Sequence, residues 1–147
     1  MNSSSDLRQT LKDVFASQRF CVLATQGEGQ PYGSLVAFAE TGDLKQLVFA
    51  THRDSRKFSN LTSDPRVALV IDSRSNDDSD FRNAVAITAL GPAHEATGGE
   101  RERLAGVYLA KHPSLVGFIG SPGMAVCSVE VEEYIVARFS GVTRLQA

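Results

Sequence analysis

The sequence is poor in cysteine and proline, has no large excess of charge of one sign, and has no long hydrophobic run. It contains 2 Cys and 5 Pro among 147 residues, which is too few thiols for a disulfide scaffold. Lys and Arg number 15, Asp and Glu number 17, and the formal net charge is −2. No broad positive field attracts a nucleic-acid backbone, and no apolar run approaches the roughly 20 residues of a membrane helix. We therefore expect no nucleic-acid and no membrane partner.

The length and apolar content are those of one compact domain. Hydrophobic residues make up 42% of the chain, enough for a core of useful size. We expect a single domain over 1–147, with 1–5 as a flexible polar tail. The segment 1–6 lacks the charged and apolar regions of a signal peptide, so a cytoplasmic location is expected. Cys21 and Cys127 each lie in an apolar run, which predicts two reduced core thiols.

Hydrophobic spacing predicts many short strands and few helices. An amphipathic helix with Ser5 or Asp6 as its cap precedes the strands, and Gly91-Pro92 is expected at a bend or an edge. The chain lacks the regular βαβ rhythm of a doubly wound sheet, so the expected fold class is mostly β, an antiparallel barrel with peripheral helices. Strands are expected at 20–25, 31–39, 46–51, 67–71, 85–95 and within 125–139, and helices over 7–15, 55–64 and 100–112.

The segment 47–70 carries the clearest indication of a binding site. A strand runs directly into a short helix that opens with Ser55, Arg56 and Lys57. The first amides of a helix have no partner within the helix, and its positive dipole end adds to the two cations. Ser55 is the expected N-cap, and Thr51 and Arg53 leave the strand on the same side. An anion such as a phosphate fits this arrangement; the alternative is a solvated basic turn.

The same residues resemble those of the pyridoxamine 5'-phosphate oxidase-like family. Its flavin mononucleotide (FMN)-binding strand ends in Thr and continues through Ser-Arg-Lys into a helix, as Thr51 and 55–57 do here. The run 60–67 and the strand opening at 29–32 also match that family in order. The resemblance covers about residues 6–140 and implies an FMN-binding split β-barrel that assembles as a homodimer, with each flavin site at the subunit interface.

The resemblance also implies roles for individual residues. Arg56 and Lys57, after Ser55, would bind the FMN phosphate. Thr51 and the main chain of Ala50 would lie along the flavin. The preceding strand would support the isoalloxazine ring through five consecutive residues, Ser34, Leu35, Val36, Ala37 and Phe38.

Two departures from the family pattern bear on the substrate. Pyridoxamine phosphate oxidases carry an Arg and a Lys flanking the second strand, where this chain has Ser34 and Ala39. They also have an Arg-x-His pair near the C-terminus, whereas the segment 138–145 contains no His. We therefore do not expect oxidation of pyridoxine phosphate. The segment 134–142 instead resembles the end of haem-utilisation-type split barrels.

Four functions remain open at this point. The leading hypothesis is an FMN-dependent oxidoreductase acting on an unidentified small molecule, without assigned catalytic residues. The alternatives are a flavin carrier or sensor without turnover, a haem-binding or haem-degrading protein, and a barrel that binds a deazaflavin in the same groove.

The remaining polar motifs are weaker. His52, His94 and His112 lack the spacing of metal ligands, so no metal site is predicted. Tyr108 and His112 share a helical face, and we keep them as secondary site candidates beside a core-packing role. The glycine-rich run 117–123 lacks the Lys-Ser/Thr ending of a phosphate loop and is expected to be a plain loop.

Overall fold

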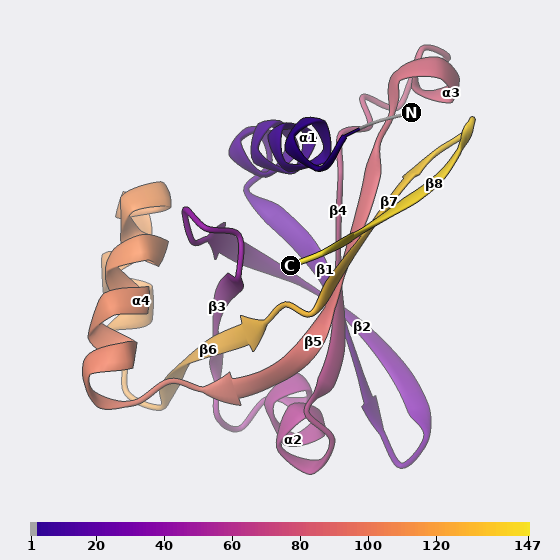
Figure 1. The fold of residues 1–147 in the computed structure, drawn as a ribbon. Coiled ribbons are helices and arrows are strands. Elements are labelled where there is room, and N and C mark those ends of the chain that lie inside the picture. The colour runs from indigo at the N-terminus through magenta and orange to yellow at the C-terminus, as the bar shows by residue number, and fades with distance from the viewer. Residues whose placement is uncertain (1–2) are drawn as a thin grey trace.

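The computed structural model describes residues 3–147 and shows the expected barrel (Figure 1). Six antiparallel strands in the order β4-β1-β2-β3-β6-β5 close on themselves through the β4–β5 pairing, and the β7–β8 hairpin is paired onto β5. The strands of this part of the chain are β1 (Phe20–Gly27), β2 (Gln30–Glu40), β3 (Gln46–His52), β4 (Arg66–Asp72), β5 (Ala86–Glu95), β6 (Met124–Glu130), β7 (Glu133–Arg138) and β8 (Gly141–Gln146). The prediction of a mostly β barrel with peripheral helices is confirmed.

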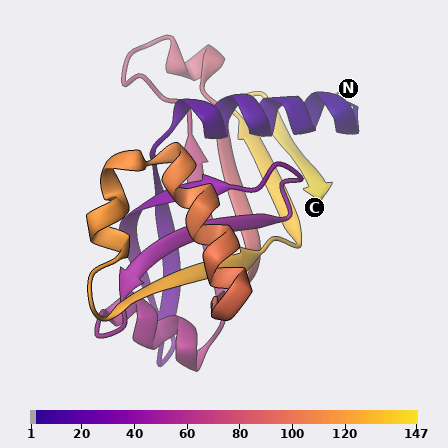
Figure 2. The ribbon, with the colours of Figure 1, turned by 90° about the vertical axis from the view of Figure 1, so that its left-hand side faces the viewer.

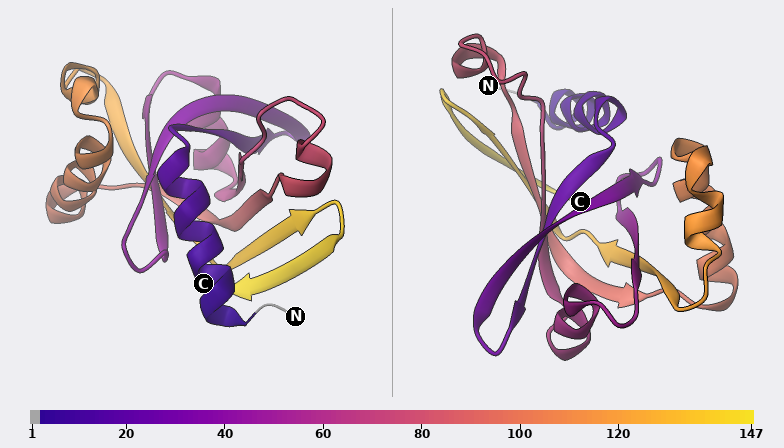
Figure 3. Two further views of the ribbon diagram at one scale, coloured as in Figure 1. Left: turned by 90° about the horizontal axis from the view of Figure 1, so that it is seen from above. Right: turned by 180° about the vertical axis from the view of Figure 1, so that it is seen from behind.

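The helices lie around the barrel rather than between its strands (Figures 1 and 3). Helix α1 crosses one end of the barrel and α2 lies at the opposite end, while α4 stands beside β3 and β6 (Figure 2). Their bounds are α1 (Ser4–Ser17), α2 (Arg56–Ser63), α3 (Asp80–Asn83), α4 (Gly98–Lys111), the 3-10 turn η1 (Pro113–Leu115) and α5 (Val116–Ile119). No helix among residues 3–147 is long and apolar enough to cross a membrane.

Strand β5 joins the barrel to the hairpin by changing partners along its length. Its first half pairs with β7, and Ala93–Glu95 pair with β6. Gly91 lies at this change, where a Cβ atom would come within 2.9 Å of the Glu130 carbonyl carbon and closer still to the oxygen. Only a residue without a side chain lets the two backbones approach this closely. The predicted bend at Gly91-Pro92 thus has a tertiary cause.

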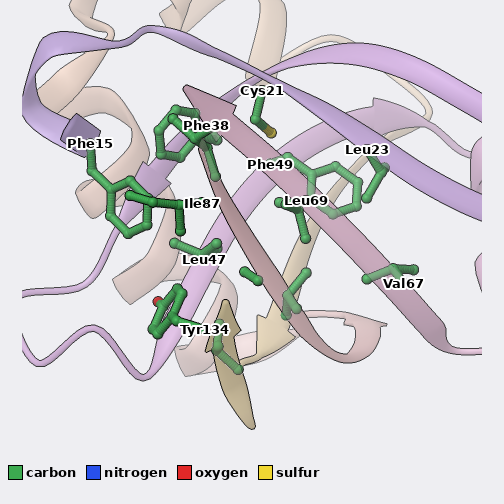
Figure 4. Packing of buried hydrophobic residues seen from close by; sticks show 14 of the residues in the cluster. Phe15, Cys21, Leu23, Phe38, Leu47, Phe49, Val67, Leu69, Ile87 and Tyr134 are labelled. Carbon is green, nitrogen blue, oxygen red and sulfur yellow. The ribbon is translucent and has the colours of Figure 1, made fainter. Parts of the chain in front are cut away.

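The barrel interior holds the main hydrophobic core (Figure 4). Alternate side chains of each strand point inward, as the two-residue period of a strand requires. Phe15 of α1 closes the end of the barrel, with its ring edge-on to Phe38 at 5.7 Å between centroids. Deeper along the same cluster, the Tyr134 hydroxyl donates a hydrogen bond of 2.7 Å to the carbonyl of Leu44, whose backbone has a φ of 62°. That bond stabilises a turn conformation that leucine seldom adopts.

A second cluster joins α4 to the outside of the barrel. Leu104 and Tyr108 pack from α4 against Val48 and Val126 of β3 and β6. At the end of α4, the Lys111 ammonium donates to a Glu40 carboxylate oxygen at 2.9 Å and to the Phe15 carbonyl at 2.8 Å. This contact attaches α4 both to β2 and to α1, so the helix is positioned by apolar packing and by a half-buried ion pair.

Three local predictions were wrong in detail, and one strand was not predicted. Ser3, not Ser5 or Asp6, caps α1, and Asp6 completes a capping box with it, so 3–5 belong to the helix start rather than to a tail. The first two residues of the expected tail lie outside the described residues. The expected loop at 117–123 begins within helix α5. Strand β8 was not predicted, because its own strand pattern is weak and it becomes a strand by pairing with β7 across the short turn at 139–140.

The two cysteines are free and buried, as the sequence predicted. Burial raises the pKa of both the Cys21 and the Cys127 thiol from 9.0 to about 12. We therefore expect iodoacetamide to leave both thiols unmodified in the native protein at pH 8.5 and to label both in urea, as mass spectrometry would show. Unfolded thiols ionise near pH 9 and folded ones near 12. Between these values the unfolded state is favoured by ionisation, so the free energy of unfolding should fall as the pH rises from about 9 towards 12. Labelling of native protein would contradict the buried placement.

Candidate functional site

The turn from β3 into α2 positions the predicted anion-binding residues. The Ser55 hydroxyl accepts a hydrogen bond from the Phe58 amide at 3.3 Å, so the predicted N-cap is confirmed. The hydroxyls of Thr51 and Ser55 lie 3.0 Å apart and are hydrogen-bonded, which fixes the end of the strand to the start of the helix. Helix α2 has no acidic residue in its first turn. The positive end of its dipole is therefore not neutralised from within the helix.

The two predicted cations extend from the first turn of α2 in different directions. Lys57 is half-buried and lines the neighbouring groove. The Arg56 guanidinium lies over the Tyr32 ring, 4.5 Å from its centroid, and is exposed. Arg53, which the sequence placed on the same side as Thr51, is instead ion-paired with Glu95 at 2.7 Å. Lys57 thus lines the groove, whereas Arg56, which lies between two lining residues in the chain, packs against Tyr32.

A groove of about 380 Å³ opens between the β2–β3 surface, the start of α2 and the segment after α4. This volume is in the range of pockets that bind small molecules. Apolar side chains dominate its walls and polar ones gather at the α2 end. Its lining residues are Phe20, Leu35, Val36, Ala37, Ala50, Thr51, His52, Ser55, Lys57, Leu115 and Phe118.

The structure brings most of the sequence-predicted site residues into this groove and leaves three outside its lining. Ser34 is half-buried and its hydroxyl lies 3.5 Å from the Leu23 carbonyl. Phe38 points into the barrel core (Figure 4), because strand alternation directs it opposite to Ala37. Arg56 lies against Tyr32 beside the groove. For Phe38, only the main chain remains near the groove side of β2.

Two groove residues that sequence reasoning missed are aromatic. Phe20 opens β1 and is 55% exposed, and Phe118 in α5 is 40% exposed. The Phe118 ring lies edge-on to His52, with 6.4 Å between centroids. Their apolar character was visible in the sequence, but their exposure was not, since an apolar residue in a strand or helix is by default assigned to the core.

An exposed apolar rim borders the groove: Phe20, Leu35 and Phe118 line it, and Val22 lies next to Leu35 on the neighbouring strand. Val22 is paired with Leu35 across β1 and β2, and Leu35 is 66% exposed. Contiguous exposed apolar side chains of this kind mark surfaces that bind another molecule. We refer to these four residues below as the apolar rim.

Tyr108 and His112, the secondary candidates, are both buried and neither lines the groove. His112 donates from Nε2 to the Phe38 carbonyl at 2.7 Å, and its ring packs on Tyr108 at 5.1 Å. Burial raises the pKa of the Tyr108 hydroxyl to about 12. These two residues connect α4 to β2, which is the core-packing role considered from the sequence.

Comparison with known proteins identifies the family. The family model described as pyridoxamine 5'-phosphate oxidase matches residues 7–135. The chain belongs to this family. Among curated proteins, no sequence matches it. The family assignment and the barrel topology agree with the resemblance drawn from 29–32, 51–57 and 60–67.

Solved structures with the same fold include two whose names give different ligands. The haem-binding protein from Mycobacterium smegmatis has a TM-score of 0.84 at 20% identity, over 99% of this chain and 59% of that one. Campylobacter jejuni ChuZ has a TM-score of 0.81 at 14% identity, over 99% of this chain and 61% of that one. A FAD-binding protein from Mesorhizobium loti has a TM-score of 0.71 at 15% identity, over 95% and 94% of the two chains. This chain therefore spans about three fifths of the first two proteins, and at these identities the likeness shows the fold alone.

Proposed function

We propose that the chain binds FMN in the groove and acts as an FMN-dependent oxidoreductase on a small molecule. The observation that carries this proposal is one groove with two chemically different ends. The α2 end offers Lys57, the Ser55 hydroxyl and the amides of residues 56 and 57, which precede the capped Phe58 amide, to an anion, and the β2–β3 wall offers an apolar surface to a flat ring. When bound, FMN supplies the hydride or electron transfer, while the protein supplies orientation and shielding from water.

The roles proposed for the residues follow from their placement. Lys57 and Arg56 bind the phosphate, the latter by turning from the Tyr32 ring towards the groove. Thr51 and the main chain of Ala50 lie along the flavin. Leu35 and Ala37 support the ring with their side chains, while Ser34, Val36 and Phe38 contribute the strand backbone between and beside them.

The absorption spectrum of the purified protein, followed by titration with FMN, tests this proposal. We expect flavin bands in the visible region and one FMN per chain. Riboflavin, which lacks the phosphate, should bind at least roughly ten-fold more weakly, because it cannot accept the charge-assisted hydrogen bonds of the α2 end. A deazaflavin would give a different spectrum. Protein that neither carries nor binds any flavin would overturn the proposal.

Pyridoxine phosphate is not the proposed substrate. Ser34 and Ala39 stand where the family's oxidases have cations, and Ala39 is buried beneath α4. The ionisable side chains that line the groove are His52 and Lys57, and Lys57 is assigned to the phosphate. A flavin carrier or sensor without turnover is distinguished by assay: bound FMN that is not reduced by NAD(P)H and not reoxidised by oxygen would favour that function.

Haem binding is the second candidate, because an exposed histidine, His52, lines the same groove. Imidazole is a common axial ligand of haem iron. The haem-binding protein from Mycobacterium smegmatis shares the fold, which makes the test worthwhile. A Soret band that develops on haem titration and is lost in His52→Ala would favour this candidate over FMN.

We further propose that two chains form a homodimer across the apolar rim, with FMN held between them. A ligand that contacts both subunits binds the dimer more tightly than the monomer, so FMN should tighten the dimer. Sedimentation velocity over a dilution series, with and without FMN, measures this linkage. Leu35→Asp should shift the protein towards monomer, whereas Val142→Asp, equally exposed on the β7–β8 hairpin, should not. A monomer that binds FMN fully would contradict the shared site.

A further inference from the structure

Three potential metal ligands meet on the surface between α4 and the barrel. They are His94 from β5, Glu100 from the first turn of α4 and Glu130 from the end of β6, and their ligand atoms all lie within 4.8 Å of one another. His94 Nε2 is 2.9 Å from a Glu100 carboxylate oxygen. The proposed flavin groove contains none of these residues. We propose that His94, Glu100 and Glu130 bind a zinc ion.

The register of the sheet produces this convergence. His94 pairs with Ser128 across β5 and β6, and residues 128 and 130 point to the same face of β6. Glu130 is therefore the diagonal neighbour of His94, within reach of a long side chain. Helix α4 starts close by, with the glycine pair 98–99 as its first two residues, and brings Glu100 over that face. Ligands from three elements show no regular spacing in the sequence, which explains why no metal site was predicted from it.

The hydrogen bonds around Glu130 orient its carboxylate as an outer shell orients a metal ligand. Gln46 Nε2 donates to Glu130 Oε1 at 3.0 Å and to the fully buried Ser128 hydroxyl at 3.0 Å. Arg103 in turn donates to Gln46 Oε1 at 3.0 Å, which fixes the orientation of that amide. Among residues 3–147, the hydrogen bonds to Glu130 side-chain atoms all end on Oε1. The other oxygen remains available to a cation.

The local charge also favours a cation. Within residues 3–147 Glu130 forms no ion pair, and the partner of Glu100 is the His94 imidazole, which carries a charge only when it is protonated. The Glu100 and Glu130 carboxylates therefore lie close together, and neither has a Lys or Arg ion-pair partner in this part of the chain. A divalent ion compensates both carboxylates at once.

The donor set selects the type of ion. One imidazole with two carboxylates suits zinc and related first-row divalent ions, whereas Mg²⁺ prefers oxygen ligands and retains its waters. Three protein ligands with one water complete a tetrahedral zinc site. Ligand atoms on a zinc ion lie closer together than 4.8 Å, so the side chains must move inward, which their partial exposure permits.

Zinc at this position would fix the start of α4 to β5 and β6. Thr97, the N-cap of α4, makes no side-chain capping hydrogen bond, and Gly98 follows with a φ of 58°. The helix start thus lacks the usual cap, and a shared metal ion would compensate for it. The ion has a structural role, distinct from the flavin site and independent of whether FMN binds.

Calorimetric titration of tag-free protein with zinc chloride tests the site. We expect one ion per chain, a higher melting temperature with zinc, and no binding of Mg²⁺ at the same concentration. His94→Ala and Glu130→Gln should each weaken zinc binding at least roughly ten-fold while keeping the native circular dichroism spectrum. The matched controls are His52→Ala, which removes an exposed histidine elsewhere, and Glu102→Gln, which removes an exposed acid from the same helix; both should bind zinc as the parent does.

Two results would overturn the proposal. The first is the absence of zinc binding by the folded parent protein, which would leave the three residues as an ordinary polar cluster. The second is equal zinc binding by His94→Ala and the parent, which would place the ion elsewhere on the chain.

Discussion

Replacing both Arg56 and Lys57 with alanine is expected to weaken FMN binding by at least about 100-fold. Each charge-assisted hydrogen bond to a phosphate contributes about 1.5–3 kcal/mol, and about 1.4 kcal/mol corresponds to a ten-fold change in affinity. Lys57→Ala alone should show the larger single loss, because Lys57 lines the groove whereas Arg56 must first leave the Tyr32 ring. Flavin fluorescence titration measures the dissociation constants of the parent, the double variant, Lys57→Ala and Arg56→Ala.

The matched control for this double variant is Lys12→Ala with Lys45→Ala. Both lysines are exposed, and neither lines the groove. The control removes the same number of positive charges, so it separates a local contact from a change in overall charge. We expect it to bind FMN as the parent protein does, with a salt dependence close to that of the parent. Equal affinity of the parent and the Arg56/Lys57 double variant would remove α2 from the site.

Gly91→Ala is expected to destabilise the fold by about 3 kcal/mol or more, because overpacking against rigid backbone costs at the upper end of the usual range. The new methyl group would meet the Glu130 carbonyl and the Val131 Cα, which are main-chain atoms rather than flexible side chains. Relief requires β5 to move away from the end of β6, where the Leu90 carbonyl accepts the Glu132 amide at 2.8 Å. With a total stability of about 5–15 kcal/mol for a domain, the loss is large.

Gly106→Ala is the same substitution at a helical position, and it is expected to stabilise the protein. Gly106 lies inside α4, and a methyl group added there would meet no atom within 4 Å beyond the adjoining backbone of its own helix. Alanine at this position should stabilise the protein by about 0.5–1 kcal/mol, because glycine is a poor helix former. Urea denaturation of both variants, followed by circular dichroism, gives the two changes in unfolding free energy. A Gly91→Ala protein as stable as the parent would show that β5 and β6 do not approach as described.

Local features of the fold could be predicted where the determinant is short in sequence. The strand periods of 20–25 and 46–51 and the Ser55 cap with Pro65 beyond it depend on neighbouring residues, so the elements appear where expected. The strand β8 could not be found in the same way. Its six residues become a strand by pairing with β7, and only Leu145 among them is buried.

The candidate site, too, could be predicted only where its residues are close together in the sequence. Thr51 and 55–57 are close in sequence, and one strand-to-helix turn brings them together, so their pattern alone indicated an anion site. Phe38 belongs to a strand that was correctly placed, yet its side chain enters the core. The sequence pattern of 34–38 did not decide which residues face the groove, because all but Ser34 are apolar and the alternation can start on either face.

The sequence by itself determined most of the strands and helices, the buried thiols and the family, and it predicted an anion site at the start of α2, since each depends on residue type and on spacing within a few turns or strand steps. The tertiary structure alone decided which distant residues meet. The β3–β6 pairing, which places His52 opposite Met124, brings Phe118 to the groove edge beside His52, and the β5–β6 register brings His94 to Glu130. The same register makes Gly91 indispensable. Such contacts depend on the closure and register of the sheet, which leave no periodic trace in the chain.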